Sequence, residues 1–227
     1  MKAESPKNLV PQFFDKTAYT YDKVVNLTTF GKDRHWKKEI LKKIPNCNSI
    51  LDLACGTGIL TFQIAENFPD SKIVAVDMTE SYLNVARMKL KPYHKITFLN
   101  QDAEKLNLDS KFDCITSSYI PKYCNADILI SACLNHLNRG GKIILHDFIY
   151  PQNQLIRGSW NLYFIVLKLI GCLVSSWKDV FTNLPKLIRS TRWLADYENI
   201  MKKHGLQTTI QPLTLGTSAI LTGTQQV

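Results

Sequence analysis

The chain has 227 residues, which is enough for one domain with a sizeable buried core. Hydrophobic residues make up 45% and charged residues 21% of the chain, a balance that excludes a disordered or low-complexity protein. The N-terminus, MKAESPKNLVPQFF, has no apolar stretch long enough for a signal-peptide core, so we expect a protein that stays inside the cell. The net charge of +9 is spread along the chain. It is compatible with binding to nucleic acid, with binding to an anionic membrane surface, and with no specific partner at all.

Six cysteines are scattered through the chain and form no CxxC pair. Most of their neighbours are apolar. This spacing predicts neither a zinc site nor a disulfide framework, so we expect buried or bystander thiols and no bound metal.

The chain begins with a helical pattern over residues 12–44, which Pro45 ends. From Ser49 on, short apolar runs alternate with amphipathic stretches. The apolar runs predict strands buried on both faces at 49–54, 72–77, 96–100, 112–118 and 142–148. Helical spacing of apolar residues is found between them at 59–68, 80–91 and 126–137. This alternation predicts a parallel sheet with helices on both faces.

The last third of the chain departs from this alternation. NRGG (138–141) predicts a helix stop that leads into the fifth strand. Residues 152–204 predict a helical cap, and 206–223 a closing hairpin. We therefore predict a single α/β domain over 1–227, with a Rossmann-like, seven-stranded, mostly parallel sheet and helical N-terminal and cap additions.

The segment ILDLACGTGIL (50–60) carries the first functional signal. The strand delivers Cys55-Gly56-Thr57-Gly58 to the carboxyl edge of the sheet, where ligands bind in such folds, and glycine lets a ligand approach the backbone. A dinucleotide-binding turn would have a third glycine where this chain has Thr61. Asp52 is also unfavourable to a pyrophosphate, but it suits a ligand with a positive charge, such as the amino-acid part of S-adenosylmethionine.

Two more acids follow the next two predicted strands. Asp77 ends strand 72–77, where a carboxylate can bind both ribose hydroxyls, and Asp102 follows strand 96–100, where it can meet an adenine amino group. Each acid alone is typical of a strand-end cap or a solvated turn. Three at the ends of successive strands, beside a glycine turn, favour a nucleoside site. The sheet pattern alone leaves an NAD enzyme and a methyltransferase open.

This pattern resembles class I S-adenosylmethionine-dependent methyltransferases, in which DLACGTG is the first cofactor motif. AYTYDKVVNLTTFGKDRHWKK (18–38) further resembles the N-terminal segment of the ubiquinone/menaquinone-biosynthesis C-methyltransferases. The resemblance continues in chain order through DMTESYLNVAR, QDAEKL and RGGKIILHDF to LTLGTSAILTG, and covers roughly residues 12–223. SSYIPKY (117–123) lacks the [DNS]-P-P-[FY] segment of many base N-methyltransferases, which weighs against that activity.

The resemblance implies S-adenosylmethionine as cofactor and a prenylated quinol as acceptor, methylated at a ring carbon. From it and from the motifs we expect cofactor contacts at Asp52, Gly56, Thr57, Gly58, Asp77, Met78, Asp102, Ala103 and Ser118. The family's arginine after strand four falls on Lys122, and its glycine on Ile120. Lysine keeps the positive charge of arginine but lacks the planar guanidinium group that can bind two oxygens at once. The placement of the quinol ring is therefore left open.

Methylation at carbon requires a ring hydroxyl to lose its proton. We expect Lys122 to stabilise the phenolate. For the proton acceptor we consider Asp147 and His146 of LHDF, or Tyr21 and Asp22 acting through water. The catalytic prediction is therefore Lys122, Asp147 and Tyr21.

WNLYFIVLKLIGCLV (160–174) is more apolar than a surface helix should be, yet it is shorter than the ~20 residues of a membrane span, and Lys168 interrupts it. It fits either a core helix or a cap helix that lines a channel for a polyprenyl tail. In the second case Trp160, Tyr163, Phe164 and Trp177 would rest on the membrane together with the basic surface.

We expect a cytoplasmic protein, held peripherally at the inner face of the membrane, that binds no nucleic acid. Self-association as a homodimer is left open. Two alternatives are a methyltransferase of another amphipathic acceptor, such as phosphatidylethanolamine, and a non-catalytic protein that binds S-adenosylmethionine and acts as a scaffold for quinone synthesis.

Overall fold

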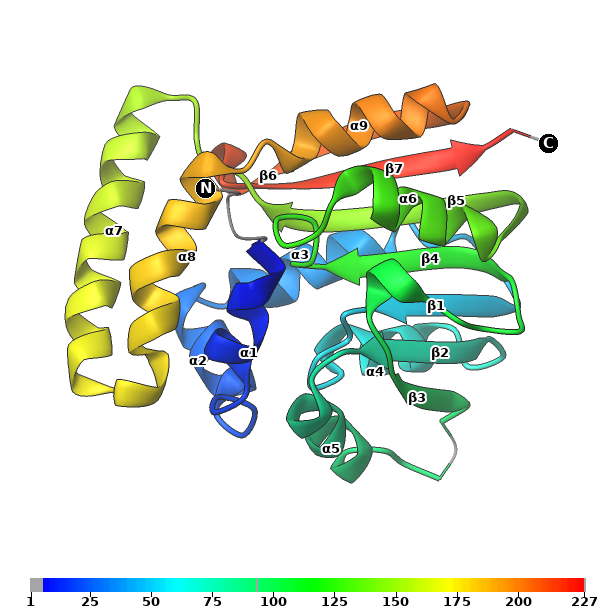
Figure 1. The fold of residues 1–227 in the computed structure, drawn as a ribbon, viewed down its shortest axis with the longest axis horizontal. Helices are drawn as coiled ribbons and strands as arrows, with labels where there is room; N and C mark the ends of the chain where they lie inside the picture. Colours follow the sequence, from blue (N-terminus) through cyan, green and yellow to red (C-terminus); the bar gives the residue numbers. More distant parts are fainter. Residues whose placement is uncertain (1–5, 93, 227) are drawn as a thin grey trace.

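The computed structural model describes residues 6–92 and 94–226, and the remaining residues of the predicted span 1–227 lie outside the described residues (Figure 1). Its centre is a seven-stranded sheet in the order β3-β2-β1-β4-β5-β7-β6. The parallel strands are β1 (Ser49–Leu53), β2 (Lys72–Asp77), β3 (Ile96–Asn100), β4 (Phe112–Ser118) and β5 (Leu137–Phe148). β6 (Leu206–Leu213) and β7 (Ser218–Gln225) form the antiparallel hairpin, with β7 beside β5. The predicted Rossmann-like, mostly parallel sheet is confirmed.

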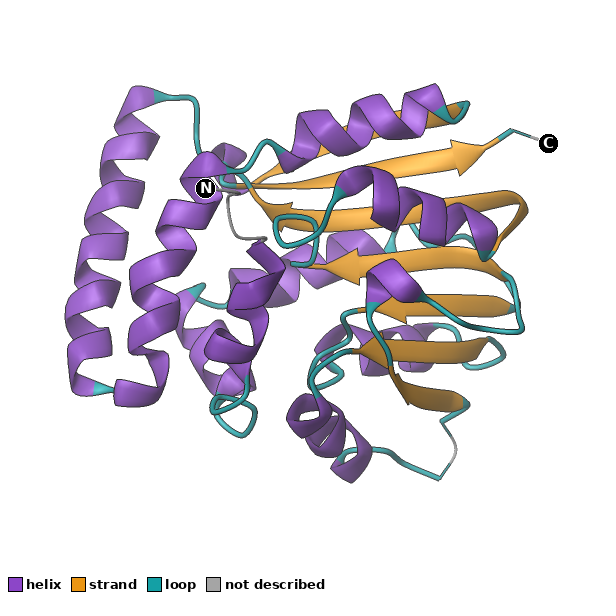
Figure 2. Cartoon of the chain, in the orientation of Figure 1, coloured by secondary structure: helices purple, strands orange, loops and turns teal. Residues whose placement is uncertain are grey.

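Helices cover both faces of this sheet (Figure 2). On one face α3 (Lys32–Leu41) and α4 (Ile59–Asn67) pack over Ile50, Ile73 and Ile144, and α5 (Glu80–Met88) follows along the same side. On the other face α6 (Ala126–Asn135) and α9 (Trp193–Lys203) pack over Leu51 and Ile115. Since neighbouring residues of a strand point to opposite faces, a continuous apolar run is needed to fill both layers.

A second helical layer lies beyond the carboxyl ends of the parallel strands (Figure 1). It consists of η1 (Pro6–Asn8), α1 (Leu9–Phe14), α2 (Tyr21–Thr28), α7 (Gln154–Leu173), η3 (Ser175–Trp177) and α8 (Lys178–Ser190). These helices share an apolar core in which Phe13, Trp160 and Phe181 are buried. An N-terminal segment and the segment between β5 and α9 therefore close over one edge of the sheet.

The largest differences from the predicted boundaries are the following. The N-terminal helical segment is broken between Phe14 and Tyr21 and again at Gly31, whose φ of +73° lies in the left-handed region. β5 begins at Leu137 rather than at residue 142, because the chain pairs with β4 through a register shift where a helix stop was expected. The cap ends at Ser190 rather than at residue 204, because α9 packs on α6, β6 and β7. Two short 3-10 helices, η2 (Ala103–Lys105) and η4 (Thr214–Gly216), complete the fold.

Candidate functional site

The glycine turn after β1 is fixed by the neighbouring strand. Its backbone has positive φ at Ala54, Gly56 and Gly58, the last being the residue before α4. The Gly56 N–H donates to Asp77 Oδ2 over 2.8 Å. A Cβ on Gly56 would lie 3.4 Å from the ring of Tyr82. The turn therefore needs glycine at this position for its positive φ, whereas a Cβ would only touch the ring of Tyr82.

Asp77 is the carboxylate at the end of β2. Besides Gly56, it accepts the N–H of Thr79 over 2.8 Å. Burial raises the pKa of this carboxyl group, and the two backbone donors oppose the rise. The side chain is buried but lines a cavity, so its oxygens lie where they can accept hydrogen bonds from a ligand.

Asp102 follows β3 and caps η2. Its Oδ1 accepts the N–H of Glu104 over 3.0 Å, and its other oxygen is paired with the ammonium group of Lys7. Lys7 also contacts Glu104 at 2.6 Å. The N-terminal helical layer is thus tied to the third acid of the strand ends.

A cavity of about 460 Å³ connects these acids with the cap. Its wall on the sheet side includes Gly56, Asp77, Asp102 and Ser118. Its opposite wall is formed by apolar and aromatic side chains of the helical layer: Val10, Phe14, Tyr21, Trp160, Tyr163, Phe164, Leu167, Trp177, Val180, Phe181 and Leu184. A polar edge and an apolar chamber therefore share one space.

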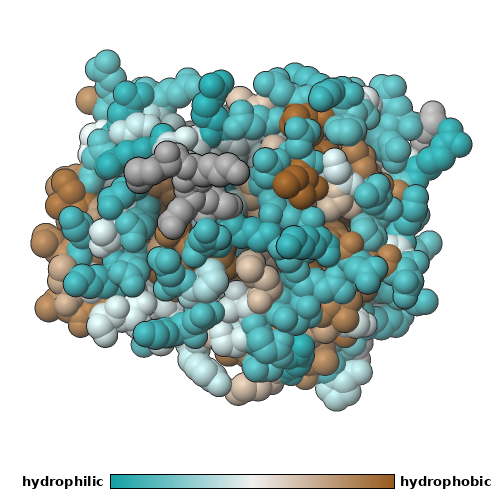
Figure 3. Space-filling model, in the orientation of Figure 1, coloured by the Kyte–Doolittle hydropathy of each residue, from teal (hydrophilic) through white to brown (hydrophobic). Residues whose placement is uncertain are grey.

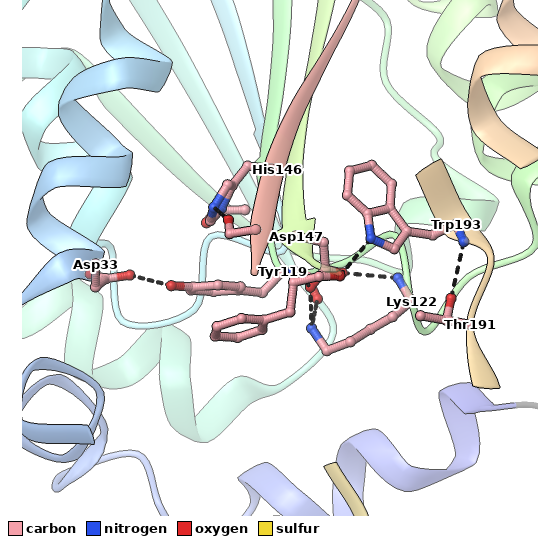
Figure 4. A network of polar contacts seen from close by, with 10 residues as sticks. Asp33, Tyr119, Lys122, His146, Asp147, Thr191 and Trp193 are labelled. Atoms are coloured by element: carbon pink, nitrogen blue, oxygen red, sulfur yellow. Dashed lines mark hydrogen bonds and ion pairs between the residues drawn. The ribbon is translucent and has the colours of Figure 1, made fainter. Parts of the chain in front are cut away.

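Between the two walls, Lys122 and Asp147 form a buried ion pair (Figure 4). Lys122 Nζ lies 2.8 Å from Asp147 Oδ1 and donates to the carbonyl oxygen of Tyr119 over 2.7 Å. Asp147 Oδ2 accepts the backbone N–H of Lys122. Burial lowers the pKa of Lys122, and the neighbouring carboxylate opposes that shift.

Aromatic rings surround the ammonium group of Lys122. The centroids of the Tyr123, Tyr119 and Phe148 rings lie 4.6, 5.3 and 5.7 Å from Nζ. Tyr119 adopts φ +78°, a strained conformation for a residue with a side chain, and its hydroxyl donates to Asp33 over 2.6 Å (Figure 4). The ring faces favour a cation at this point of the cavity wall.

The structure places eight of the twelve predicted site residues on the cavity wall: Lys122, Tyr21, Gly56, Asp77, Met78, Asp102, Ala103 and Ser118. The other four, Asp52, Thr57, Gly58 and Asp147, do not line it. Asp147 lies directly behind Lys122 and is fully buried.

Asp52 lies beneath the turn rather than facing a ligand. Its two oxygens accept hydrogen bonds from the hydroxyls of Thr61 and Thr116, and burial raises its pKa to about 6. The predicted direct contact with a cofactor amine is therefore replaced by a bridge from β1 to α4 and β4.

Thr57 and Gly58 have structural partners as well. The Thr57 hydroxyl donates to Asp22 of α2, whose carboxylate also pairs with Lys89. Gly58 φ is +83°, and a Cβ there would lie 2.5 Å from the ring of Phe62. These two residues shape the turn and join it to the helical layer.

His146, considered as a proton acceptor, is fully buried. Its two ring nitrogens contact the hydroxyls of Ser118 and Ser218 at 2.9 and 2.6 Å. Burial lowers its pKa well below the usual value, and Lys37 and Lys122 add to the effect. It is a packed, neutral strand histidine rather than a group exposed to the cavity.

Several polar or aromatic wall residues were missed by the sequence analysis, among them Lys7, Tyr82 and Tyr119. Tyr82 follows Asp77 by five residues, and an aromatic on the inward face of that helix was a usable signal. Tyr119 directly follows strand 112–118, another usable signal. Lys7 pairs with residues about 95 positions away, so no local pattern reveals it.

The fit of these residues to S-adenosylmethionine can be judged from their chemistry. Asp77 offers carboxylate oxygens for vicinal hydroxyls, Asp102 an acceptor for an exocyclic amine, and Gly56 an open approach to backbone. Aromatic rings of Phe14, Tyr21 and Tyr82 pack edge to face beside this edge and supply flat apolar surface for a base. The donor set fits an adenosine-bearing ligand.

Comparisons with known proteins agree with the fold and the motifs. The model of the ubiE/COQ5 methyltransferase family matches residues 1–225. A demethylmenaquinone methyltransferase from Bacteroides fragilis is 26% identical over 225 residues, 95% of this chain and 92% of that protein. The ubiquinone/menaquinone biosynthesis C-methyltransferase UbiE from Shewanella frigidimarina is 30% identical over 199 residues, 83% of this chain and 79% of that protein.

Solved structures share the fold at lower identity. The magnesium protoporphyrin IX methyltransferase ChlM from Synechocystis PCC 6803 has a TM-score of 0.66 at 18% identity, covering 97% of this chain and 100% of that chain. The phosphoethanolamine N-methyltransferase 2 from Haemonchus contortus has a TM-score of 0.68 at 15% identity, covering 100% of this chain and 61% of that chain. The whole-length family match settles the assignment: the chain is an S-adenosylmethionine-dependent methyltransferase of the ubiE/COQ5 methyltransferase family.

Proposed function

We propose that this protein methylates a ring carbon of a prenylated hydroquinone in quinone biosynthesis. The observation that carries the proposal is the cavity itself, which joins the acidic strand ends to an apolar chamber with one buried ammonium group between them. A hydroxylated ring with a long hydrocarbon tail matches this arrangement, because it is polar at one end and apolar along the rest of its length. The family's named relatives act in menaquinone and ubiquinone biosynthesis, which supports the assignment.

The cofactor would be held at the sheet edge by Asp77, Asp102 and the open backbone of Gly56, with Met78, Ala103 and Ser118 on the adjoining wall. When bound there, S-adenosylmethionine supplies an electrophilic methyl group. The chain contributes alignment of the acceptor carbon and exclusion of water from the chamber. Alignment is the larger contribution, because a well-held pair of reactants can lower the barrier by roughly 7–11 kcal/mol.

Lys122 is proposed to stabilise the phenolate that makes the ring carbon nucleophilic. The ring hydroxyl would release its proton to solvent as the acceptor binds, and the methylated carbon would lose its hydrogen as a second proton to solvent after transfer. Two of the three N–H bonds of its ammonium group can be assigned to Asp147 and to the Tyr119 carbonyl. The third remains for a ring oxygen in the cavity that Lys122 lines. A fixed cation in an apolar, water-poor wall lowers the energy of such an oxyanion strongly.

The predicted proton acceptors take other roles in this proposal. Asp147 accepts from the Lys122 and Phe148 backbone as well as from Nζ, so it orients the lysine rather than meeting the acceptor. Burial raises the pKa of Tyr21 well above its usual value, so its hydroxyl is protonated at neutral pH and can donate to the acceptor. Asp147 then positions a group that touches the acceptor, whereas Tyr21 would contact the acceptor directly.

The experiment is a methyl-transfer assay with labelled S-adenosylmethionine and two separate acceptors, demethylmenaquinol and phosphatidylethanolamine. We expect label in the quinol and none above background in the phospholipid. Label in the phospholipid instead would replace the proposal with a lipid N-methyltransferase. Label in neither, with calorimetric binding of S-adenosylmethionine intact, would favour a non-catalytic scaffold.

A further inference from the structure

The outward face of α7 is mostly apolar, interrupted at Gly158 and Ser159. Leu155, Leu162, Leu169 and Leu173 are 84%, 63%, 65% and 88% exposed, and Ile165, Val166 and Ile170 lie among them. The opposite face, with Trp160, Phe164, Leu167 and Gly171, is buried against the cap. A surface helix normally presents polar residues to water. An apolar face of this size marks an interaction site.

This face adjoins the mouth of the cavity. Phe30 and Ser159 are both exposed and both line the cavity, so the cavity opens between the corner after α2 and α7. Met78, at the sheet edge, is an exposed lining residue as well. The ring of Phe30 lies 5.9 Å from that of Tyr163, and the Tyr163 hydroxyl donates to the Thr28 carbonyl. Phe30 is 80% and the nearby Leu27 71% exposed. Apolar side chains therefore surround the opening on two sides.

The charges beside this face are almost all positive. Residues 154–192 contain six cations and one acid, Asp179, a net charge of +5 out of the +9 of the whole chain. The cations are Arg157, Lys168, Lys178, Lys186, Arg189 and Arg192. Arg157 and Lys168 lie on α7 itself, and the other four lie on or directly after α8, which packs against α7. Figure 3 shows apolar atoms gathered along the α7 edge of the molecule.

We propose that the outward face of α7, together with Leu27 and Phe30, docks into the interfacial layer of an anionic lipid bilayer, with the cavity mouth facing the lipid. An amphipathic helix with cations at its borders binds in the plane of such an interface. The role assigned to the mouth, uptake of a long-tailed acceptor from the bilayer, rests on the proposed function, whereas the docking surface itself stands on the exposed residues.

Two other occupants fit the observations less well. α7 has 20 residues and by length and composition could cross a membrane, so the expectation that this stretch is too short is not confirmed. Its inner face, with Trp160, Phe164 and Leu167, forms the cap core with α8, and withdrawing the helix would expose that core. A second copy of the chain packed on this face would bring two cationic borders together, six cations against six with one acid on each side. An anionic surface complements the charge, whereas a copy repels it.

The structure also corrects the expected membrane contacts. Trp160, Phe164 and Trp177, predicted to rest on the membrane, are 7%, 7% and 3% exposed and form the cap core and the cavity wall. Tyr163 lies at the mouth with its hydroxyl bonded. The exposed aliphatic residues on the outward face of α7, rather than these aromatic residues, are available for contact with the membrane.

The test is vesicle flotation of the full chain, with vesicles of phosphatidylcholine alone and of phosphatidylcholine with phosphatidylglycerol, at low and high salt. We expect binding to the anionic vesicles that falls with salt. Leu162→Glu/Leu169→Glu should weaken it at least tenfold, since both side chains lose favourable apolar burial. Lys168→Glu/Lys186→Glu should weaken it at low salt, by about fivefold for each cation lost, and less at high salt.

The matched control is Met88→Glu/Ile128→Glu, which adds the same charge at exposed apolar residues away from α7 and should leave flotation unchanged. Calorimetric binding of S-adenosylmethionine checks that every variant is folded. Absence of flotation for the wild type, or an equal loss in the control, would overturn the proposal. A dimer in light scattering that Leu162→Glu/Leu169→Glu dissolves, without vesicle binding, would assign the face to a second copy. Flotation without quinol methylation would leave the surface standing and reject the proposed acceptor.

Discussion

The two walls of the cavity are built from different kinds of sequence information. The sheet-side wall takes its polar groups from three successive strand ends, so each group lies next to the strand that positions it. The helical wall joins residues of α1 and α2 to residues of α7 and α8 from more than a hundred positions away. Polar recognition here is local, whereas the apolar chamber is a product of long-range packing.

This difference predicts that variants of the two walls affect different measured quantities. Changes on the sheet side should alter the affinity for S-adenosylmethionine, and changes at Lys122 or in the helical layer should alter acceptor turnover. The ion pair of Lys122 and Asp147 lies at the junction, attached to the ends of β4 and β5. It offers the strongest test.

Lys122→Met should have the largest effect, because it leaves the fully buried carboxylate of Asp147 without its cation. Breaking a buried pair on one side costs about 3–5 kcal/mol of unfolding free energy. In Lys122→Met/Asp147→Asn the charge is gone from both partners, and we expect at least half of that loss to be recovered. Guanidinium unfolding measures both variants.

The double variant also separates folding from chemistry. Without the ammonium group near the ring oxygen, its turnover of the quinol should fall about a hundredfold, the size expected when one oxyanion-stabilising donor is removed. Calorimetric affinity for S-adenosylmethionine should stay within about twofold. If this variant turned over the quinol at the wild-type rate, Lys122 would have no role in the reaction.

Asp77→Ala probes the sheet-side wall. It removes the acceptor for the Gly56 and Thr79 backbone as well as the proposed ribose contacts, and hydrogen bonds to a charged group contribute about 1.5–3 kcal/mol each. We expect affinity for S-adenosylmethionine to fall about a hundredfold. At saturating cofactor, turnover of the quinol should recover most of its wild-type value. A drop in turnover with unchanged affinity would move Asp77 out of the cofactor wall.

Asp52→Asn tests the buried bridge beneath the turn. Burial raises the pKa of Asp52 from 3.8 to about 6, so the folded protein holds its proton more tightly than the unfolded chain does. Its ionisation therefore lowers stability as pH rises from about 4 to 6, by up to about 3 kcal/mol, and the penalty is absent at lower pH. The stability difference between Asp52→Asn and the wild type should grow across this window. A difference independent of pH would mean that Asp52 is ionised in the folded protein without penalty.

The sequence could predict much of the sheet-side wall because strand ends and their turns are local features. β2, β3 and β4 have the predicted bounds, and Asp77 and Asp102 lie on the cavity wall. Asp52 was misplaced because it lies inside β1, where its side chain points to the face covered by α4 rather than to the edge. One position along a strand decides between these two environments.

The helical wall could not be predicted from local sequence patterns. Periodicity identified an apolar helix near residue 160, but both of its faces are apolar, and which of them is buried depends on α8 and on the N-terminal helices. The same holds for Asp147, whose partner Lys122 lies on another strand end. Pairings across the sheet and between distant helices follow from the three-dimensional arrangement.

Substitution of Lys7 has the smallest expected effect, and it tests whether the N-terminal helical layer influences cofactor binding at the sheet edge. Its ammonium group pairs with Asp102 and Glu104 in the protein, so a ligand amine that uses Asp102 must compete with it. A partly exposed ion pair contributes up to about 1 kcal/mol, and Lys7→Ala should therefore raise the affinity for S-adenosylmethionine by about twofold to fivefold. Lys105→Ala removes an exposed charge from the neighbouring η2 and serves as the control, with no change expected. Weaker binding in Lys7→Ala would instead indicate that the lysine contacts the ligand and that the N-terminal layer supports cofactor binding.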